Sequence, residues 1–254
     1  MFETNEVKDA LKSFLIAHES VIAAWEGGSA ATGSADQYSD LDLIIITEGI
    51  EADAMFEELK SLLKRVFGIV RQFRMPEPCW HGMSQCFYLL RDTPDFFYCD
   101  LTIADKNTPD KFTEPDRHGK VIVWFDQGGV YSASESPASD VQRRARRLFH
   151  TATDTDFLTI IELHKAIARR HWIDSLMNYI QFINRNLVIL LNLKYRVAKA
   201  DFGIGHAQRD YPTEVFEMLE KLLRVCTIED ISQKSSAAIQ LYEELKQELK
   251  LKLK

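Results

Sequence analysis

The chain has 254 residues and a formal net charge of −7, and 46% of its residues are hydrophobic. This composition excludes a disordered chain and is sufficient for one large or two modest packed domains. The negative net charge argues against a broad basic surface that binds nucleic acid. It is more compatible with a small neutral or cationic partner.

The first part of the chain predicts a helix, a strand, a turn of small residues and a second strand. Apolar residues at helical spacing indicate a helix from Asn5, its N-cap, to about residue 18. The apolar segment 21–25 then enters the turn 27–39, and the β-branched strand 41–47 follows it. We expect the two strands to form a hairpin-like unit.

Two aspartates, Asp40 and Asp42, stand at alternate positions where the second strand begins. Side chains alternate across a strand, so both carboxylates are expected on one face, with Leu41 and Leu43 on the core face. Two such charges about 4 Å apart near a protein surface repel by about 4 kcal/mol, which a divalent cation relieves. Mg²⁺ is favoured because it prefers carboxylate oxygens and is often completed by substrate phosphates.

The turn before this strand contains Gly27, Gly28 and Ser29. Glycines permit close backbone approach, and free amides together with the Ser29 hydroxyl can hold phosphate oxygens. A Gly-Gly-Ser run alone is usually only a loop, and the acidic pair alone is compatible with a solvated turn before an edge strand. The occurrence of both, in this order before an apolar strand, favours a phosphate and metal site.

The pattern resembles the signature of the nucleotidyltransferases of the DNA polymerase beta superfamily. The matching positions are Gly28, Ser29, Gly33, Ser39, Asp40, Asp42 and Leu43. The resemblance implies that Asp40 and Asp42 are catalytic metal ligands and that Gly28, Ser29 and Ser39 bind the nucleotide. It also implies Mg²⁺ as cofactor and a nucleoside triphosphate, with ATP favoured, as co-substrate.

One departure from the family pattern concerns charge. Many members carry arginines between the two motifs, whereas residues 30–36 here contain no positive charge. Neutralisation of a triphosphate is therefore expected from the metal, from backbone amides or from a base elsewhere, such as Arg71 or Arg74.

Further along the chain, periodicity predicts a helix over 52–67, ended by Gly68, and a strand over 69–73. Two more strands, 84–90 and 96–104, are separated by a turn-rich connection that is typical of an antiparallel pair.

The last of these strands carries a third acid, Asp100, on the face opposite Cys99 and Leu101. An isolated acid in a strand is more often simply hydrated. Superfamily members commonly place a third carboxylate beside the acidic pair, so the resemblance implies that Asp100 is a further catalytic and metal-binding residue. The context of Asp100 and the later segment 121–126 look like the aminoglycoside 6-adenylyltransferases, the streptomycin-modifying branch, which implies a role in antibiotic resistance.

The character of the chain changes near residue 135, after a linker-like stretch over 132–137. Beyond it, helices are predicted over 139–150, 154–172, 173–195, 213–226 and 228–254. We therefore expect a nucleotidyltransferase domain over 1–135, with a mixed sheet flanked by helices, and an all-α helical acceptor-binding domain over 136–254. The predicted fold class is α+β.

Several sites and locations are not expected. The four cysteines, none of them in Cys-x-x-Cys spacing, are Cys79, Cys86, Cys99 and Cys226. They predict free thiols rather than a zinc site or a disulfide framework.

The chain has early acids at Glu3 and Glu6 and no apolar run of about 18 residues. We therefore expect neither a signal peptide nor a membrane anchor. We expect a cytoplasmic location.

The function predicted from the sequence is Mg²⁺-dependent transfer of a nucleoside monophosphate, AMP from ATP, to a hydroxyl of a small acceptor such as an aminoglycoside, with release of pyrophosphate. Two alternatives stay open: a non-catalytic, antitoxin-like nucleotide-binding or interaction protein, and a nucleotidyltransferase that acts on a protein or another metabolite. The sequence leaves the oligomeric state open.

Overall fold

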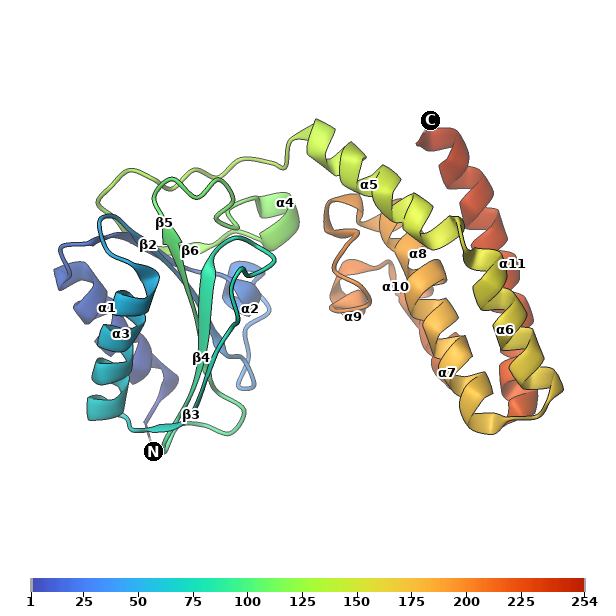
Figure 1. Cartoon of the computed structure of the whole chain (residues 1–254), viewed down its shortest axis with the longest axis horizontal. Coiled ribbons are helices and arrows are strands. Elements are labelled where there is room, and N and C mark those ends of the chain that lie inside the picture. The colour runs from blue at the N-terminus through green and yellow to red at the C-terminus, as the bar shows by residue number, and fades with distance from the viewer. Residues whose placement is uncertain (1, 254) are drawn as a thin grey trace. The chain divides into compact units, whose positions relative to one another are not determined.

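The structure is a computed structural model that describes residues 2–253, and the chain divides into two compact units, Met1–Glu135 and Ser136–Lys254. In the first unit a mixed sheet is flanked by helices, and the regular elements of the second unit, within the described residues, are all helices (Figure 1). The predicted α+β class, with a mixed sheet and a helical C-terminal part, is confirmed.

The sheet has six strands in the order β3-β4-β5-β2-β1-β6. Their bounds are β1 (Val21–Glu26), β2 (Leu41–Thr47), β3 (Ile69–Arg74), β4 (Ser84–Leu90), β5 (Cys99–Asp105) and β6 (Ile122–Asp126). The central strands β2 and β5 run parallel, whereas the other neighbouring pairs are antiparallel. β1 and β2 thus form the predicted antiparallel unit.

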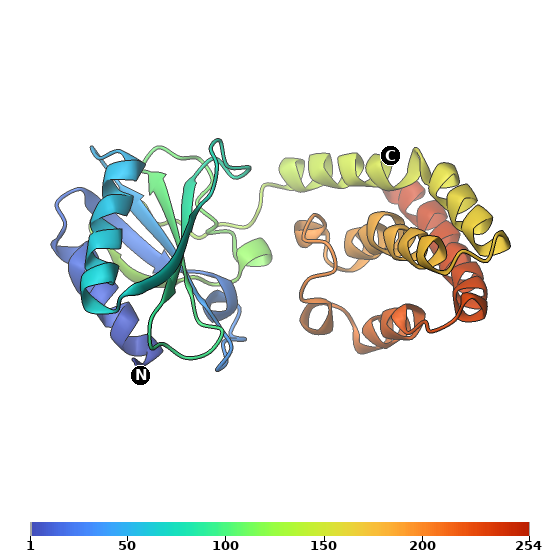
Figure 2. The same ribbon diagram turned by 60° about the horizontal axis from the view of Figure 1, so that its bottom comes forward.

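Helices α1 (Thr4–Ala17) and α3 (Ala52–Val66) lie on one face of the sheet, and the short helices α2 (Gly28–Ala31) and α4 (Pro115–His118) lie on the other (Figure 2). The larger core of the unit forms beneath α1 and α3, because each buries an apolar stripe against the sheet. Trp25, Ile44 and Ile46 form a smaller cluster on the opposite face with Ala31 of α2.

In the first unit, three differences from the prediction exceed a shift of one residue at an element's end or concern its type. Helix α1 begins before Asn5, because the backbone amide of Glu3 donates to Oε2 of Glu6 at 2.7 Å and so closes the first turn. Part of the predicted small-residue turn forms the helical turn α2. Strand β5 begins at Cys99 rather than at residue 96, because Phe96 has φ +70°, which interrupts an extended backbone.

The helices of the second unit are α5 (Ala138–Thr153), α6 (Asp156–Ala168), α7 (Trp172–Phe182), α8 (Val188–Tyr195), α9 (Ala207–Asp210), α10 (Thr213–Leu223) and α11 (Ile228–Lys252). A π-helix, η1 (Ile183–Leu187), joins α7 to α8, and a 3₁₀ turn, η2 (Val197–Lys199), follows α8. Within residues 2–253, every helix is too short or too polar to cross a membrane.

The segment from α7 to α8 supplies much of the core of this unit, with Tyr179, Phe182, Leu187 and Leu190 fully buried. The helix predicted over 154–172 ends early, because Arg170 has φ +57° and turns the chain before α7. The final helix ends at Lys252, and the predicted last residue, Lys254, lies outside the described residues.

Candidate functional site

Two of the predicted site residues are direct neighbours in the sheet. In the parallel register of β2 and β5, Asp42 is paired with Asp100. Residues paired in register project to the same side of a sheet, and the alternate residues Leu43 and Leu101 belong to the core beneath α1 and α3. Both carboxylates therefore project from the other face of the two central strands, away from this core.

The surroundings of both carboxyl groups disfavour their charged forms. Burial, followed by the charges of Asp40, Asp100 and Glu26, raises the pKa of Asp42 to about 7. Burial also raises the pKa of Asp100 to about 6, with a contribution from Asp40. A divalent cation would relieve this clustering of negative charge, and an all-oxygen donor set fits Mg²⁺.

Gln85 of β4 holds the Asp100 carboxylate in place. Its Nε2 donates to both carboxylate oxygens at 2.8 Å each, and this hydrogen bonding opposes the rise in the pKa of Asp100. The side-chain oxygen of Gln85 in turn lies 3.2 Å from Nε2 of His81. Sequence reasoning missed Gln85, although the alternation of β4, with Cys86 and Tyr88 in the core, places it on the polar face.

The glycine turn packs directly against Asp42. The backbone amide of Gly27 donates to the carbonyl oxygen of Asp42 at 2.8 Å. Gly28 has φ +54°, and a Cβ atom added to it would lie 1.7 Å from Oδ2 of Asp42. Only glycine allows this contact, so the predicted phosphate-binding turn and the predicted metal ligand are adjacent in space.

Asp40 and the serines line a cavity of about 360 Å³ in the first unit. Ser29, Ser39 and Asp40 contribute to its wall. The Ser39 hydroxyl is engaged within the turn, where it donates to Oδ1 of Asp36 at 3.1 Å and accepts from the Asp36 amide at 2.9 Å. Asp40 lines this cavity, and its charge also acts on both Asp42 and Asp100.

A positive charge that sequence reasoning missed lines the same cavity. Lys8 of α1 reaches it and lies 2.5 Å from Oε1 of Glu26, whose side chain is only 5% exposed. Of the two arginines considered from the sequence, Arg71 and Arg74, neither lines this cavity, and Arg74 pairs with Asp53 at 3.2 Å and Glu77 at 2.5 Å. Lys8 lies far from the motif in the chain, so only the packing of α1 on the sheet could identify it.

A second group of metal-ligand side chains lies next to α4. Among residues 2–253, Asp110, Glu114 and His118 form the group of three whose ligand atoms all lie within 4.8 Å of one another; the three predicted aspartates are not held so tightly together. Burial raises the pKa of Glu114. A mixture of imidazole and carboxylate donors suits a transition metal better than Mg²⁺. In the sequence, this group is indicated by the spacing of its three members, which lie four residues apart.

Comparisons with known proteins add little to this picture. No model of a protein family matches the chain, and no curated protein matches it. Among solved structures, the chain is similar to the STING-associated CdnE c-di-GMP synthase from Capnocytophaga granulosa, with 13% sequence identity and a TM-score of 0.31 over 96% of this chain and 81% of that one. So low a degree of likeness says nothing about activity.

Proposed function

We propose that the chain is a metal-dependent nucleotidyltransferase, which transfers a nucleoside monophosphate from a nucleoside triphosphate to a hydroxyl of a small acceptor. The observation that supports this proposal is the pairing of Asp42 with Asp100 on parallel strands, with the backbone of Gly28 packed against the Asp42 carboxylate. A phosphate-binding turn beside a pair of half-buried carboxylates is what the transfer of a phosphoryl-linked group needs.

In this proposal Asp40, Asp42 and Asp100 hold Mg²⁺, which when bound neutralises charge on the phosphates. Gly28 and Ser29 position the β- and γ-phosphates through backbone amides and a hydroxyl. The acceptor oxygen attacks the α-phosphorus while the bond from that phosphorus to the bridging oxygen of the β-phosphate breaks, and pyrophosphate leaves. When Asp100 is not bound to metal, its raised pKa suits it to accept the proton of the acceptor hydroxyl.

More specifically, we propose that the chain transfers AMP from ATP to an aminoglycoside. Two features of the sequence support it: the resemblance to the streptomycin-modifying enzymes over about residues 20–130, and the net charge of −7, which suits a cationic acceptor. The corresponding role is antibiotic resistance.

The test is pyrophosphate release by the full chain with Mg²⁺ and each of the four nucleoside triphosphates, over a panel of hydroxylated acceptors that includes streptomycin. We expect release that requires an acceptor, together with an acceptor product whose mass has increased by one nucleoside monophosphate. Asp42→Asn should reduce release to background. Asp95→Asn, which changes an exposed aspartate in the turn before β5, is the matched control.

Two outcomes would overturn the proposal. Nucleotide binding without pyrophosphate release with any acceptor would favour the non-catalytic nucleotide-binding alternative. Equal release by Asp42→Asn and Asp95→Asn would show that the paired aspartates are not the site of the reaction.

A further inference from the structure

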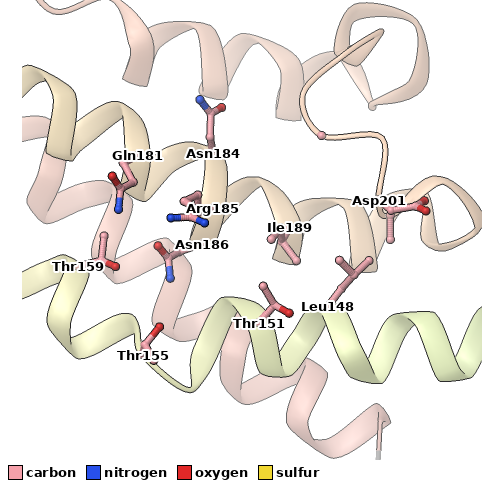
Figure 3. A pocket seen from close by; sticks show the side chains of 12 residues that line it. Leu148, Thr151, Thr155, Thr159, Gln181, Asn184, Arg185, Asn186, Ile189 and Asp201 are labelled. Atoms are coloured by element: carbon pink, nitrogen blue, oxygen red, sulfur yellow. The ribbon is translucent and has the colours of Figure 1, made fainter. Parts of the chain in front are cut away.

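A cavity of about 380 Å³ lies within the second unit. Figure 3 shows side chains from α5, from the α7–η1 segment and from the connection between α5 and α6 around one space. Its volume falls in the range of small-molecule sites, about 300–1,000 Å³. None of the residues assigned to nucleotidyl transfer lines this cavity.

The wall of this cavity is rich in uncharged polar groups. Three hydroxyls and three amides line it: Thr151, Thr155, Thr159, Gln181, Asn184 and Asn186. A hydroxyl and a primary amide each donate and accept hydrogen bonds. A ligand whose own groups both donate and accept matches such a wall best, and hydroxyl groups have this property.

Charge at the cavity is sparse. Arg185 provides one cation, and the anion of Asp201 is paired with Arg144, whose Nε lies 3.7 Å from Oδ2 of Asp201. A triphosphate would need several cations, and a polyamine several anions. The cavity therefore favours an uncharged ligand.

One amide in the wall has a hydrogen-bonding group that the protein leaves unused. Asn186 is only 4% exposed. Its Nδ2 donates to the carbonyl oxygen of Ala152 at 2.6 Å. Its buried Oδ1 has no hydrogen-bond partner among the described residues, which carries a cost in free energy. Figure 3 labels Asn186 among the side chains of the wall, with Thr159 and Arg185.

The backbone of the wall is also unusual. Within η1 the amide of Val188 bonds to the carbonyl of Ile183, five residues earlier, so the turn holds an extra residue. Such π turns are rare and occur frequently at functional sites. Consecutive side chains of an α-helix point about 100° apart, yet Asn184, Arg185 and Asn186 all line this one cavity.

We propose that this cavity binds an uncharged, polyhydroxylated small molecule, a monosaccharide or a cyclitol. The volume, the six hydroxyls and amides, the sparse charge and the π turn support the assignment together. The inference rests on the second unit alone, so it and the proposed nucleotidyl transfer can fail separately.

The test is binding to the full chain, measured by saturation-transfer difference NMR and calorimetry, with no nucleotide present. The probes are glucose and myo-inositol, with spermidine and ATP as charged comparisons. We expect saturable binding of at least one neutral probe and weaker binding of both charged ones.

Two threonines of α5 provide a matched pair of variants. The hydroxyls of Thr151 and Thr153 each donate to the carbonyl four residues earlier at 2.9 Å, but only Thr151 lines the cavity among these two. Thr151→Val should weaken binding of the neutral probe by about tenfold, whereas Thr153→Val should not. Thr155→Val, in the connection to α6, provides a second variant if Thr151→Val fails to fold.

Absence of saturable binding by both neutral probes at millimolar concentration would overturn the proposal. Equal effects of Thr151→Val and Thr153→Val would also overturn it, because they would place the neutral probe elsewhere. Preferential binding of spermidine or ATP at this cavity would show that it takes a charged ligand instead.

Discussion

Asp42 of β2 and Asp100 of β5 stand opposite each other in a parallel register, and the charge of Asp100 contributes to the raised pKa of Asp42. The two carboxyl groups therefore titrate as a coupled pair. This relationship leads to predictions for stability, for metal binding and for the residues around the pair.

Stabilisation by Mg²⁺ should grow as the pH rises. The pKa values of Asp42 and Asp100, raised from 3.8 to about 7 and about 6, mean that the metal-free folded state holds protons which the unfolded state releases. This contribution to stability is present below about pH 4 and is lost as the pH rises through about 6 to 7. Mg²⁺ competes with those protons, so its effect on Tm should be small near pH 5 and largest near pH 8.

Thermal melting with MgCl₂ or EDTA across this pH range measures the effect. Without metal, Asp42→Asn should raise stability near pH 8 by about 1–2 kcal/mol, because it removes a half-buried charge that lies near other carboxylates. It should also remove most of the response to Mg²⁺. A response to Mg²⁺ that is unchanged in Asp42→Asn would contradict the assignment of this carboxylate as a ligand.

Gly28→Ala should damage both the turn and the Asp42 carboxylate. The added methyl would lie 1.7 Å from Oδ2 of Asp42, at a φ of +54° that other residues adopt with strain. We expect a loss of about 1–3 kcal/mol in stability and loss of the response to Mg²⁺. Gly33→Ala is the matched control, because Gly33 has φ +69° with nothing within 4 Å of the added Cβ. Equal effects of the two variants on Mg²⁺ binding would exclude the steric explanation.

Gln85→Leu should disturb the reaction through Asp100. The variant removes two hydrogen bonds that lower the pKa of this carboxyl group, so the pKa of Asp100 should rise further. The acidic limb of the pH profile of kcat should move to higher pH, and kcat should fall by about 10- to 100-fold. Gln72→Leu on β3, whose amide contacts Cys86 instead, is the control. A lower kcat with an unmoved pH profile would limit Gln85 to a structural role.

Lys8→Met should leave Glu26 as a buried carboxylate without its ion-pair partner. The free energy of unfolding should fall by about 1–3 kcal/mol, because the Glu26 carboxylate stays buried and its ion pair no longer offsets the cost of that burial. The double variant Lys8→Met/Glu26→Gln should recover most of that loss. Chemical denaturation of the four proteins in the cycle measures the coupling. A loss of stability in the double variant equal to the sum of the losses in the two single variants would show that the pair is not coupled.

The site illustrates what a sequence can and cannot specify. Alternation within each strand placed Asp42 and Asp100 on polar faces, because side-chain direction is a local property. The register that pairs them depends on how distant strands meet. Lys8 was missed for the same reason, since it reaches the cavity only because α1 packs across the sheet. The π turn around Asn186 also could not be predicted locally, because the helical spacing of apolar residues runs without a break from α7 through η1 to α8.

The parallel pairing of β2 with β5 joins segments that are far apart in the chain, with α3 and two strands between them. Neither strand alone carries both Asp42 and Asp100, so a growing or refolding chain brings these two carboxylates together only after this long loop has closed. The proposed cation site would therefore be complete only when the central sheet is complete.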